Sequence, residues 1–333
     1  MLFYLLNKSF QKIGVIDNYE SVIWTTRFQD VGEFELYLPS NDPNQFQTGQ
    51  FLLRNDNDSI MIIEHIYFTT DEEKGDYCTV TGKSLEKILS QRIVWDKTEM
   101  YGRIEECIYR LVDENIINAD NSLRNISNIK CAKSKGLTTI GKFTFNGESL
   151  LDVIVELCSA YNFGFKITTN LTFEIYVGTD RSYNQTLNPY VIFSPNFDNL
   201  SQSTYENDIS DYKNVCLVYS ETSKTNRGYV HKIIGEGSGI NRRETFVDSG
   251  GEDSDEALSS RGSEALSEAK IIEIFDGQIE TSYKYGEDYF LGDIVQIENE
   301  YGKKATAQII EIIENLDESG YKCIPTFKTL EVS

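Results

Sequence analysis

The sequence predicts a mainly β, multidomain α+β protein, and three observations support this prediction. Short runs of β-branched and aromatic residues fill both ends of the chain, while helical patterns are confined to its middle. The length of 333 residues allows two or three domains, each with a core of its own. Hydrophobic residues make up 40% and aromatic residues 12% of the chain, which is typical of folded rather than disordered proteins.

The first part of the chain, residues 1–81, is expected to consist of strands. Its apolar runs are short and are separated by Asn, Asp, Gly and Pro, which favour turns. A helix is expected next, at 83–92, because Leu85, Ile88 and Leu89 share one helical face. The predicted strands are 2–6, 12–16, 21–28, 33–39, 51–56, 59–69 and 76–82.

The composition changes after residue 98. Residues 103–117 and 148–162 both carry apolar side chains at helical spacing, so each is expected to form an amphipathic helix. A hairpin is expected at 163–177, with its turn at Thr169 and Asn170. These elements predict a small α+β domain at 99–190, inserted after the first β unit.

Strands return in the last third of the chain. Residues 214–221 form the clearest strand pattern, and 227–248 resembles a hairpin. Residues 248–270 begin as an acidic loop and end with a modest helical apolar face. We therefore predict a small hairpin-and-helix insertion at 221–270, followed by a second β unit.

The two ends of the chain resemble each other, which we interpret as a duplicated β unit. Chance similarity is the alternative, because Gly, Asn and Ile recur in all β-hairpins. Residues 48–58 match 291–302, residues 61–66 match 308–313, and residues 72–80 match 317–325. This alignment pairs Gly49 with Gly292, Glu64 with Glu311, Gly75 with Gly320 and Cys78 with Cys323.

Charge and hydropathy exclude two classes of partner. The chain has 31 basic and 53 acidic residues and a net charge of −22, so specific nucleic-acid binding is not expected. The apolar start is too short for a signal peptide, and no run reaches the roughly 18 apolar residues of a membrane-spanning helix. We expect a chain that is made in the cytoplasm and stays there unless a particle carries it out.

The sequence predicts no catalytic, cofactor or metal site. His65 and His231 lie in strand patterns without a neighbouring nucleophile motif, and the six cysteines are scattered, so buried free thiols are expected. The glycine-rich stretch 235–239 is followed by a strand pattern and is expected to form a turn rather than a phosphate loop. Residues 55–58 and 248–256 are acidic but lack the spacing of a calcium loop. An acid pair for glycoside cleavage is a matter of three-dimensional distance and stays open.

Three stretches together resemble the siphophage tail-hub family, which is akin to contractile-phage baseplate hubs and to the N-terminal part of tail-associated lysins. They are residues 21–41, 80–94, and the pair formed by 242–248 and 285–302. The residues of structural interest within the resemblance, and within the repeat, are Trp24, Arg27, Gly32, Phe34, Leu36, Gly49, Gly82, Asp248, Asp288, Gly292 and Asp293.

The resemblance implies a homotrimer at the virion tail tip, made in the host bacterial cytoplasm and needing no cofactor. Each chain would carry two related β-barrel domains, 1–98 and 191–220 with 271–333, and the trimer would form a pseudo-six-fold ring. That ring would join a tail-tube or distal-tail protein above to tip or fibre proteins below, around the DNA exit channel. Its acidic surface would keep passing DNA from binding.

Two other functions stay open. Many relatives continue into a peptidase or a fibre-like extension, whereas this sequence ends at Ser333, so a hub without a lytic domain is expected. A tail-associated cell-wall hydrolase is one alternative. A receptor- or carbohydrate-binding module is the other, because Tyr and Trp stack on sugars, although only two tryptophans are present.

Overall fold

The computed structural model describes residues 1–40, 42, 44–71, 75–222, 228–249, 254–279 and 283–332. They form two compact units. Unit 1 comprises Met1–Ile88, Gly164–Tyr205 and Ile274–Ser333, and unit 2 comprises Leu89–Phe163 and Glu206–Glu273. The chain is mainly β, as the sequence predicts, and none of its described helices has the length and apolar character needed to span a membrane.

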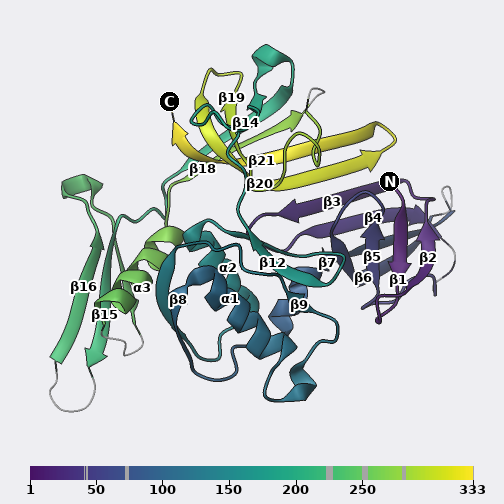
Figure 1. Cartoon of the computed structure of the whole chain (residues 1–333). Helices are drawn as coiled ribbons and strands as arrows, with labels where there is room; N and C mark the ends of the chain where they lie inside the picture. The colour runs from purple at the N-terminus through teal and green to yellow at the C-terminus, as the bar shows by residue number, and fades with distance from the viewer. Residues whose placement is uncertain are drawn as a thin grey trace. The chain divides into compact units, whose positions relative to one another are not determined.

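Unit 1 is built on one sheet, which Figure 1 shows running from the yellow C-terminal strands to the purple N-terminal ones. The described strands follow the order β14-β18-β21-β20-β3-β4-β7-β6-β5-β1-β2, and β19 pairs with both β20 and β13 beside this path. The strands are β1 (Phe3–Leu6), β2 (Lys12–Ile16), β3 (Ser21–Arg27), β4 (Glu33–Pro39), β5 (Phe51–Arg54), β6 (Ile60–Asp71), β7 (Gly75–Ser84), β13 (Ile192–Phe193), β14 (Leu200–Asp208), β18 (Ile272–Ile279), β19 (Ile294–Glu298), β20 (Lys304–Asp317) and β21 (Gly320–Val332).

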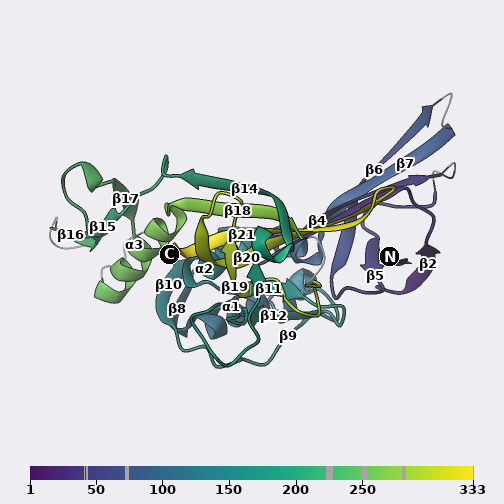
Figure 2. The ribbon, with the colours of Figure 1, turned by 90° about the horizontal axis from the view of Figure 1, so that it is seen from above.

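The first seven strands curl around a common core. Ile16 of β2 and Val22 and Trp24 of β3 belong to one buried cluster, although β2 and β3 lie far apart in the strand order. Trp24 is fully buried, and its indole nitrogen donates to the Ser59 hydroxyl at 3.1 Å. β6 and β7 run together as a long hairpin, which Figure 2 shows in blue.

The described strands of one chain form no closed barrel, unlike the two barrels expected from the sequence. The outer edge of β3 is occupied, because residues 22–27 pair antiparallel with residues 311–316 of β20. β3 therefore cannot close onto β2, and the first β unit continues directly into the second. We call this β3–β20 pairing the seam.

The internal repeat is visible in the backbone hydrogen bonds as well as in the amino-acid sequence. Gly49 and Gly292 both have a positive φ, of 82° and 92°. Each donates its N–H at 2.8 Å to the carbonyl of the equivalent isoleucine, Ile63 or Ile309. That isoleucine in turn donates to the carbonyl that follows the glycine, on Gln50 or Asp293. Positive φ explains why glycine stands at both positions.

The long hairpins match residue for residue. β6 shifts register against β7 between Ile63 and His65, and β20 shifts against β21 between Ile309 and Glu311. In both hairpins the second strand begins at a glycine that lies three residues before a buried cysteine. The equivalent pairs are Ile63–Gly82 with Ile309–Phe327, His65–Thr81 with Glu311–Thr326, Phe68–Cys78 with Glu314–Cys323, and Asp71–Gly75 with Asp317–Gly320.

This register corrects one part of the predicted alignment. Glu311 is equivalent to His65, not to Glu64, because Glu64 and Ile310 are the extra residues at the two register shifts. The predicted matches of Gly49 with Gly292, Gly75 with Gly320 and Cys78 with Cys323 agree with the pairing. Both strands carry one extra residue at the equivalent place, so the bulge itself does not shift one repeat against the other. The predicted alignment is off by one place because it matches the letters IIE, which occur in both strands one position apart.

Unit 2 combines helices with two small sheets. β8 (Thr98–Arg103) pairs with β10 (Ile140–Phe145), and β15 (Val215–Thr222) lies between β16 (Gly228–Gly235) and β17 (Glu244–Asp248). The helices are α1 (Ile104–Val112), which continues as a π-turn at Asp113–Ile117, α2 (Leu150–Tyr161) and α3 (Asp255–Glu268), and β9 is Lys130–Cys131. Ser149 and Ser254 cap α2 and α3 through their side-chain oxygens.

The structure differs from the predicted elements in several places. Residues 85–91 form a 3₁₀-helix rather than an α-helix, and 227–248 is not a hairpin, because β16 and β17 flank β15 on opposite sides. The predicted hairpin at 163–177 is present as β11 (Gly164–Ile167) and β12 (Thr172–Tyr176), but it belongs to unit 1. Residues 206–273 group with 89–163 in unit 2, where α3 packs on α2.

Gly82 should tolerate no side chain. A Cβ there would lie 1.8 Å from the Ile62 carbonyl oxygen, whereas a Cβ on Gly14 of β2 meets nothing closer than 3.8 Å. We expect Gly82→Ala to lower the free energy of unfolding by about 3 kcal/mol, at the upper end for overpacking. Gly14→Ala is the matched control. Urea unfolding curves that coincide for the two variants would contradict this close approach.

Candidate functional site

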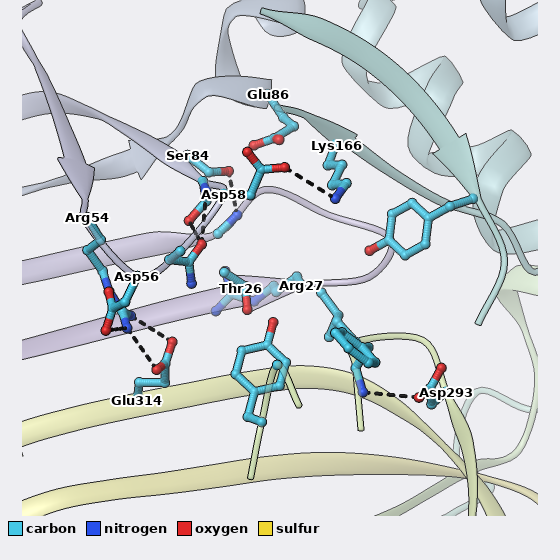
Figure 3. A pocket seen from close by; sticks show the side chains of 18 of the residues that line it. Thr26, Arg27, Arg54, Asp56, Asp58, Ser84, Glu86, Lys166, Asp293 and Glu314 are labelled. Carbon is cyan, nitrogen blue, oxygen red and sulfur yellow. Dashed lines mark hydrogen bonds and ion pairs between the residues drawn. The ribbon is translucent and has the colours of Figure 1, made fainter. Parts of the chain in front are cut away.

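A cavity with a volume of about 980 Å³ lies at the seam in unit 1. Its walls come from both repeats, from the β11–β12 hairpin, and from the segment 285–293. Figure 3 shows that charged side chains project into it from these elements.

Arg54 is a deeply buried charge at this cavity. Its side chain is 3% exposed and forms a two-fold ion pair with Glu314, at 2.7 Å from Nη1 to Oε2 and 3.0 Å from Nη2 to Oε1 (Figure 3). Its Nε donates to Asp56 at 2.9 Å, and the Tyr321 hydroxyl donates to Glu314 at 3.0 Å. Burial opposes the Arg54 charge, but the hydrogen bonds and charges of Glu314 and Asp56 outweigh it and raise the pKa of Arg54.

Arg27 of β3 forms a second ion pair across the seam, with Glu311 of β20. Its Nε lies 2.6 Å from Glu311, its Nη2 lies 2.7 Å from Glu33, and its Nη1 donates to the Val31 carbonyl at 2.9 Å. Lys83 also pairs with Glu33. Hydrogen bonds from Lys83 and Arg27 hold the pKa of Glu33 below its ordinary value. Arg27 thereby connects β3, β4 and β20.

Asp293 fastens the segment around residue 180 to the second repeat. Its carboxylate accepts from the Thr179 N–H at 2.7 Å and from the Arg181 Nε at 2.8 Å. The backbones come so close here that a Cβ on Gly178 would lie 1.7 Å from the Gly292 carbonyl oxygen. Asp293 is thus a structural residue that positions this segment.

The β11–β12 hairpin is tied to the first repeat in a similar way. Buried Glu86 accepts from the Ile167 N–H at 2.6 Å, and burial raises its pKa. Lys166 lies 3.7 Å from Asp58 (Figure 3), and the Thr169 hydroxyl donates to Asp58 at 2.6 Å. The acidic stretch 55–58 therefore supplies partners for Arg54 and Lys166.

The residues singled out from the sequence fall into three groups. Trp24, Phe34 and Leu36 are buried in the core of the first repeat. Gly32, Gly49, Gly82 and Gly292 stand where a backbone turns or approaches another closely, and Arg27, Asp293 and Asp288 make side-chain contacts, the last accepting from the Lys284 N–H. Asp248 is separate from these residues, because it ends β17 in unit 2.

The structure also shows functional residues that the sequence reasoning missed. Arg54 and Glu314 are buried ion-pair partners and Arg181 is a half-buried one, and none of the three was predicted from the sequence. A signal was available for the first two, because each is a charged residue inside an apolar strand pattern, FLLR or IIEIIENL. Buried charges are rare unless they are paired, so such positions predict a partner elsewhere in the chain.

The described residues hold no group of three His, Cys, Asp or Glu side chains placed to bind a metal ion. His65 and His231 lie exposed on strands, as predicted. All six cysteines are free, with five buried and Cys131 half-buried, and burial raises the pKa of Cys78 to about 11. The stretch 248–256 is only partly described, because residues 250–253 lie outside the described ranges.

Unit 2 contains a second charged cluster, between α2 and α3. Arg261 lies 2.9 Å from Glu156 and 3.3 Å from Glu264, whose side chain is 3% exposed. Burial and the neighbouring Glu156 charge raise the pKa of Glu264 to about 8. Burial also raises the pKa of Glu156, so a proton on Glu264 lets the two carboxyl groups share a hydrogen bond beside one arginine.

A family model described as "Siphovirus ReqiPepy6 Gp37-like protein" matches residues 2–327. No curated protein matches the chain.

The fold is similar to the tail protein of Neisseria meningitidis MC58, with a TM-score of 0.66 and 10% identity over 98% of this chain and 96% of that one. It is also similar to the 43 kDa tail protein of prophage MuSo2 from Shewanella oneidensis, with a TM-score of 0.64 and 11% identity over 98% of each chain. Prophage tail protein gp18 from Listeria monocytogenes EGD-e gives a TM-score of 0.61 and 12% identity, over 98% of this chain and 94% of that one. At these identities the likeness shows the fold alone.

Removing Glu314 should destabilise unit 1 strongly, because it leaves Arg54 charged, buried and without its main partner. We expect Glu314→Ala to cost about 3–5 kcal/mol, while the double variant Arg54→Met/Glu314→Leu stays near the wild-type stability. Asp56→Ala is the control and should cost much less, because the Asp56 side chain is 47% exposed. Urea unfolding followed by Trp24 fluorescence in a Trp95→Phe background measures this. A double variant as unstable as Glu314→Ala would contradict this explanation, in which the cost comes from the unpaired Arg54 charge.

The acid pair of unit 2 should make stability depend on pH. Because the pKa of folded Glu264 is raised from 4.5 to about 8, its contribution is fully present below pH 4.5 and is lost as the pH rises through 8. We expect the melting temperature of the wild type to fall more between pH 5 and 9 than that of Glu264→Gln. Exposed Glu256→Gln of the same helix is the control and should follow the wild type. Parallel curves for all three proteins would contradict a shared proton.

Proposed function

Because the chain belongs to the Siphovirus ReqiPepy6 Gp37-like family and its fold is similar to those of tail proteins, we propose that it is the structural hub of a phage or prophage tail tip. In this proposal it forms a trimeric, pseudo-six-fold ring that joins the tail tube to the tip. The ring surrounds the channel through which DNA leaves. The residues emphasised above then act as structural residues of the ring rather than as catalytic ones.

The internal repeat is the observation that carries this proposal. Two β units of one chain share their strand register, their bulge and their glycine turn, and they are joined side by side in one sheet. In this proposal the two units are related by a rotation of which six copies close a ring, and further chains repeat that rotation. Three chains then present six similar units, which suits a part that meets a six-fold tube on one side and a three-fold tip on the other.

The charges at the seam support a structural role over a catalytic one. Arg54, Arg27 and Arg181 are each held by carboxylates of the same unit, so these cations are engaged in holding its segments together. The exposed histidines also lie on strand surfaces rather than in the cavity. We therefore favour the hub over the cell-wall hydrolase and the carbohydrate-binding module.

The proposal assigns parts of the chain to roles. The two tube-like domains are 1–98 and 191–220 with 271–333, and the insertions are 99–190 and 221–270. A tail-tube or distal-tail protein binds above the ring and tip or fibre proteins bind below it. The net charge of −22 per chain keeps passing DNA from binding the channel wall.

The mass of the purified full chain tests the proposal. We expect light scattering over a concentration series to reach three times the chain mass of 38.0 kDa, and negative-stain averages of that species to show a ring with a central hole. The variant Arg54→Met/Glu314→Leu lacks the buried ion pair, and as a control it shows whether the ring forms without these two charges. A dimer, or a monomer with saturable binding to host cell wall, would overturn the trimeric ring.

A further inference from the structure

The sheet of unit 1 has two open strand edges that the repeat relates to each other. In the second repeat, residues 311–316 of β20 pair with β3. In the first repeat the equivalent residues 65–70 of β6 pair with β7 only, among the strands that the structure describes, because β5 pairs no further than Ile62. β14 stands first in the described strand order and has one strand neighbour in it, β18.

β14 occupies in the second repeat the place that β3 occupies in the first. β4 pairs with β7 through Phe34 opposite Gly82, and β18 pairs with β21 through Phe275 opposite Phe327, which is the position equivalent to Gly82. β18 is therefore the equivalent of β4. β14 follows β18 in the strand order as β3 follows β4, so β14 is the equivalent of β3.

From this correspondence we propose that β14 of one copy pairs with residues 65–70 of β6 in the next copy, repeating between subunits the seam that β3 and β20 form within one chain. The inference rests on the proposed ring and names the surface that closes it. The contact is head-to-tail, because one surface of each copy meets a different surface of its neighbour. A ring closed in this way leaves no open edge at either position.

The chemistry of the open edge favours a partner strand over solvent. Residues 66–70 read IYFTT, which combines β-branched and aromatic residues without a proline or a lysine. Tyr67 is 54% exposed and Phe68 is 36% exposed. Soluble proteins usually protect such an edge with charge, proline or a covering segment, since its free N–H and C=O groups bind other strands.

A second copy of this chain is the partner that the repeat specifies. The seam within one chain already shows that this edge accepts a strand from a hairpin of this type. In the first repeat, Trp24 of β3 donates to Ser59 in the turn between β5 and β6. In the second, the Ser203 N–H of β14 donates at 3.4 Å to Glu300 in the turn between β19 and β20. β3 and β14 are thus each hydrogen-bonded to the turn of their own repeat.

Mixed disulfide formation between single-cysteine additions tests the pairing. We would prepare full-length Tyr67→Cys and Thr69→Cys on β6, and Gln202→Cys and Thr204→Cys on β14, and oxidise them singly and in β6–β14 mixtures. Strands paired in a sheet bring cross-strand Cα atoms within the 4.4–6.8 Å range that a disulfide needs. We expect covalent dimers in the mixtures and not in any single variant. Val15→Cys, which is exposed on the other terminal strand β2, is the control and should not cross-link with β14.

Each result has a distinct meaning when read beside the mass of the unmodified chain. Covalent dimers from a β6 variant alone indicate an isologous edge and overturn the head-to-tail pairing. A trimeric ring whose mixtures give no disulfide overturns the pairing and leaves the proposed function standing. A chain that is monomeric at every concentration and gives no mixed disulfide counts against both proposals.

Discussion

The pairing of β3 with β20 is the contact on which the rest of unit 1 depends. It uses the edge that would otherwise let the first seven strands close on themselves, and it makes the two repeats one sheet. It also brings Arg54 and Glu314 together in the interior, two residues 260 positions apart in the chain. The pairing uses β3 of the first repeat and residues 311–316 of the second. The equivalent segments, β14 of the second repeat and residues 65–70 of the first, are therefore the ones without such a partner among the described strands.

The ion pairs at the seam fix its register more than they add to its stability. A buried pair contributes little net free energy compared with apolar residues, but separating its members is costly. Sliding β3 by two residues along β20 would keep every side chain on its own face. It would, however, draw Arg27 away from Glu311 and place Trp24 opposite a different residue. The charges therefore select one alignment among several that the apolar residues alone would allow.

Much of this fold could be predicted from the sequence, and the parts that could not share a physical cause. The strands of the first repeat, the helices at 104–112 and 150–161 and the turn at Thr169 and Asn170 all follow from local periodicity and turn chemistry. The seam could not be predicted, because strand pairing between residues nearly 300 positions apart has no local pattern. The same holds for β15, which takes β17 as a parallel neighbour instead of leaving β16 and β17 to pair. In the candidate site, the glycines were found from the internal repeat and the family resemblance, whereas the roles of Arg54 and Glu314 follow only from their pairing with each other.

The hairpin formed by β14 and β18 differs from its equivalent in one respect. β3 and β4 are joined by residues 28–32, whereas residues 209–271 connect β14 to β18 and include α3, β15, β16 and β17. Adjacent antiparallel strands begin and end side by side, so the sheet places hardly any limit on the length of chain between them. The connection from β14 to β18 can therefore change in length and content while the strand pairing of the sheet stays the same.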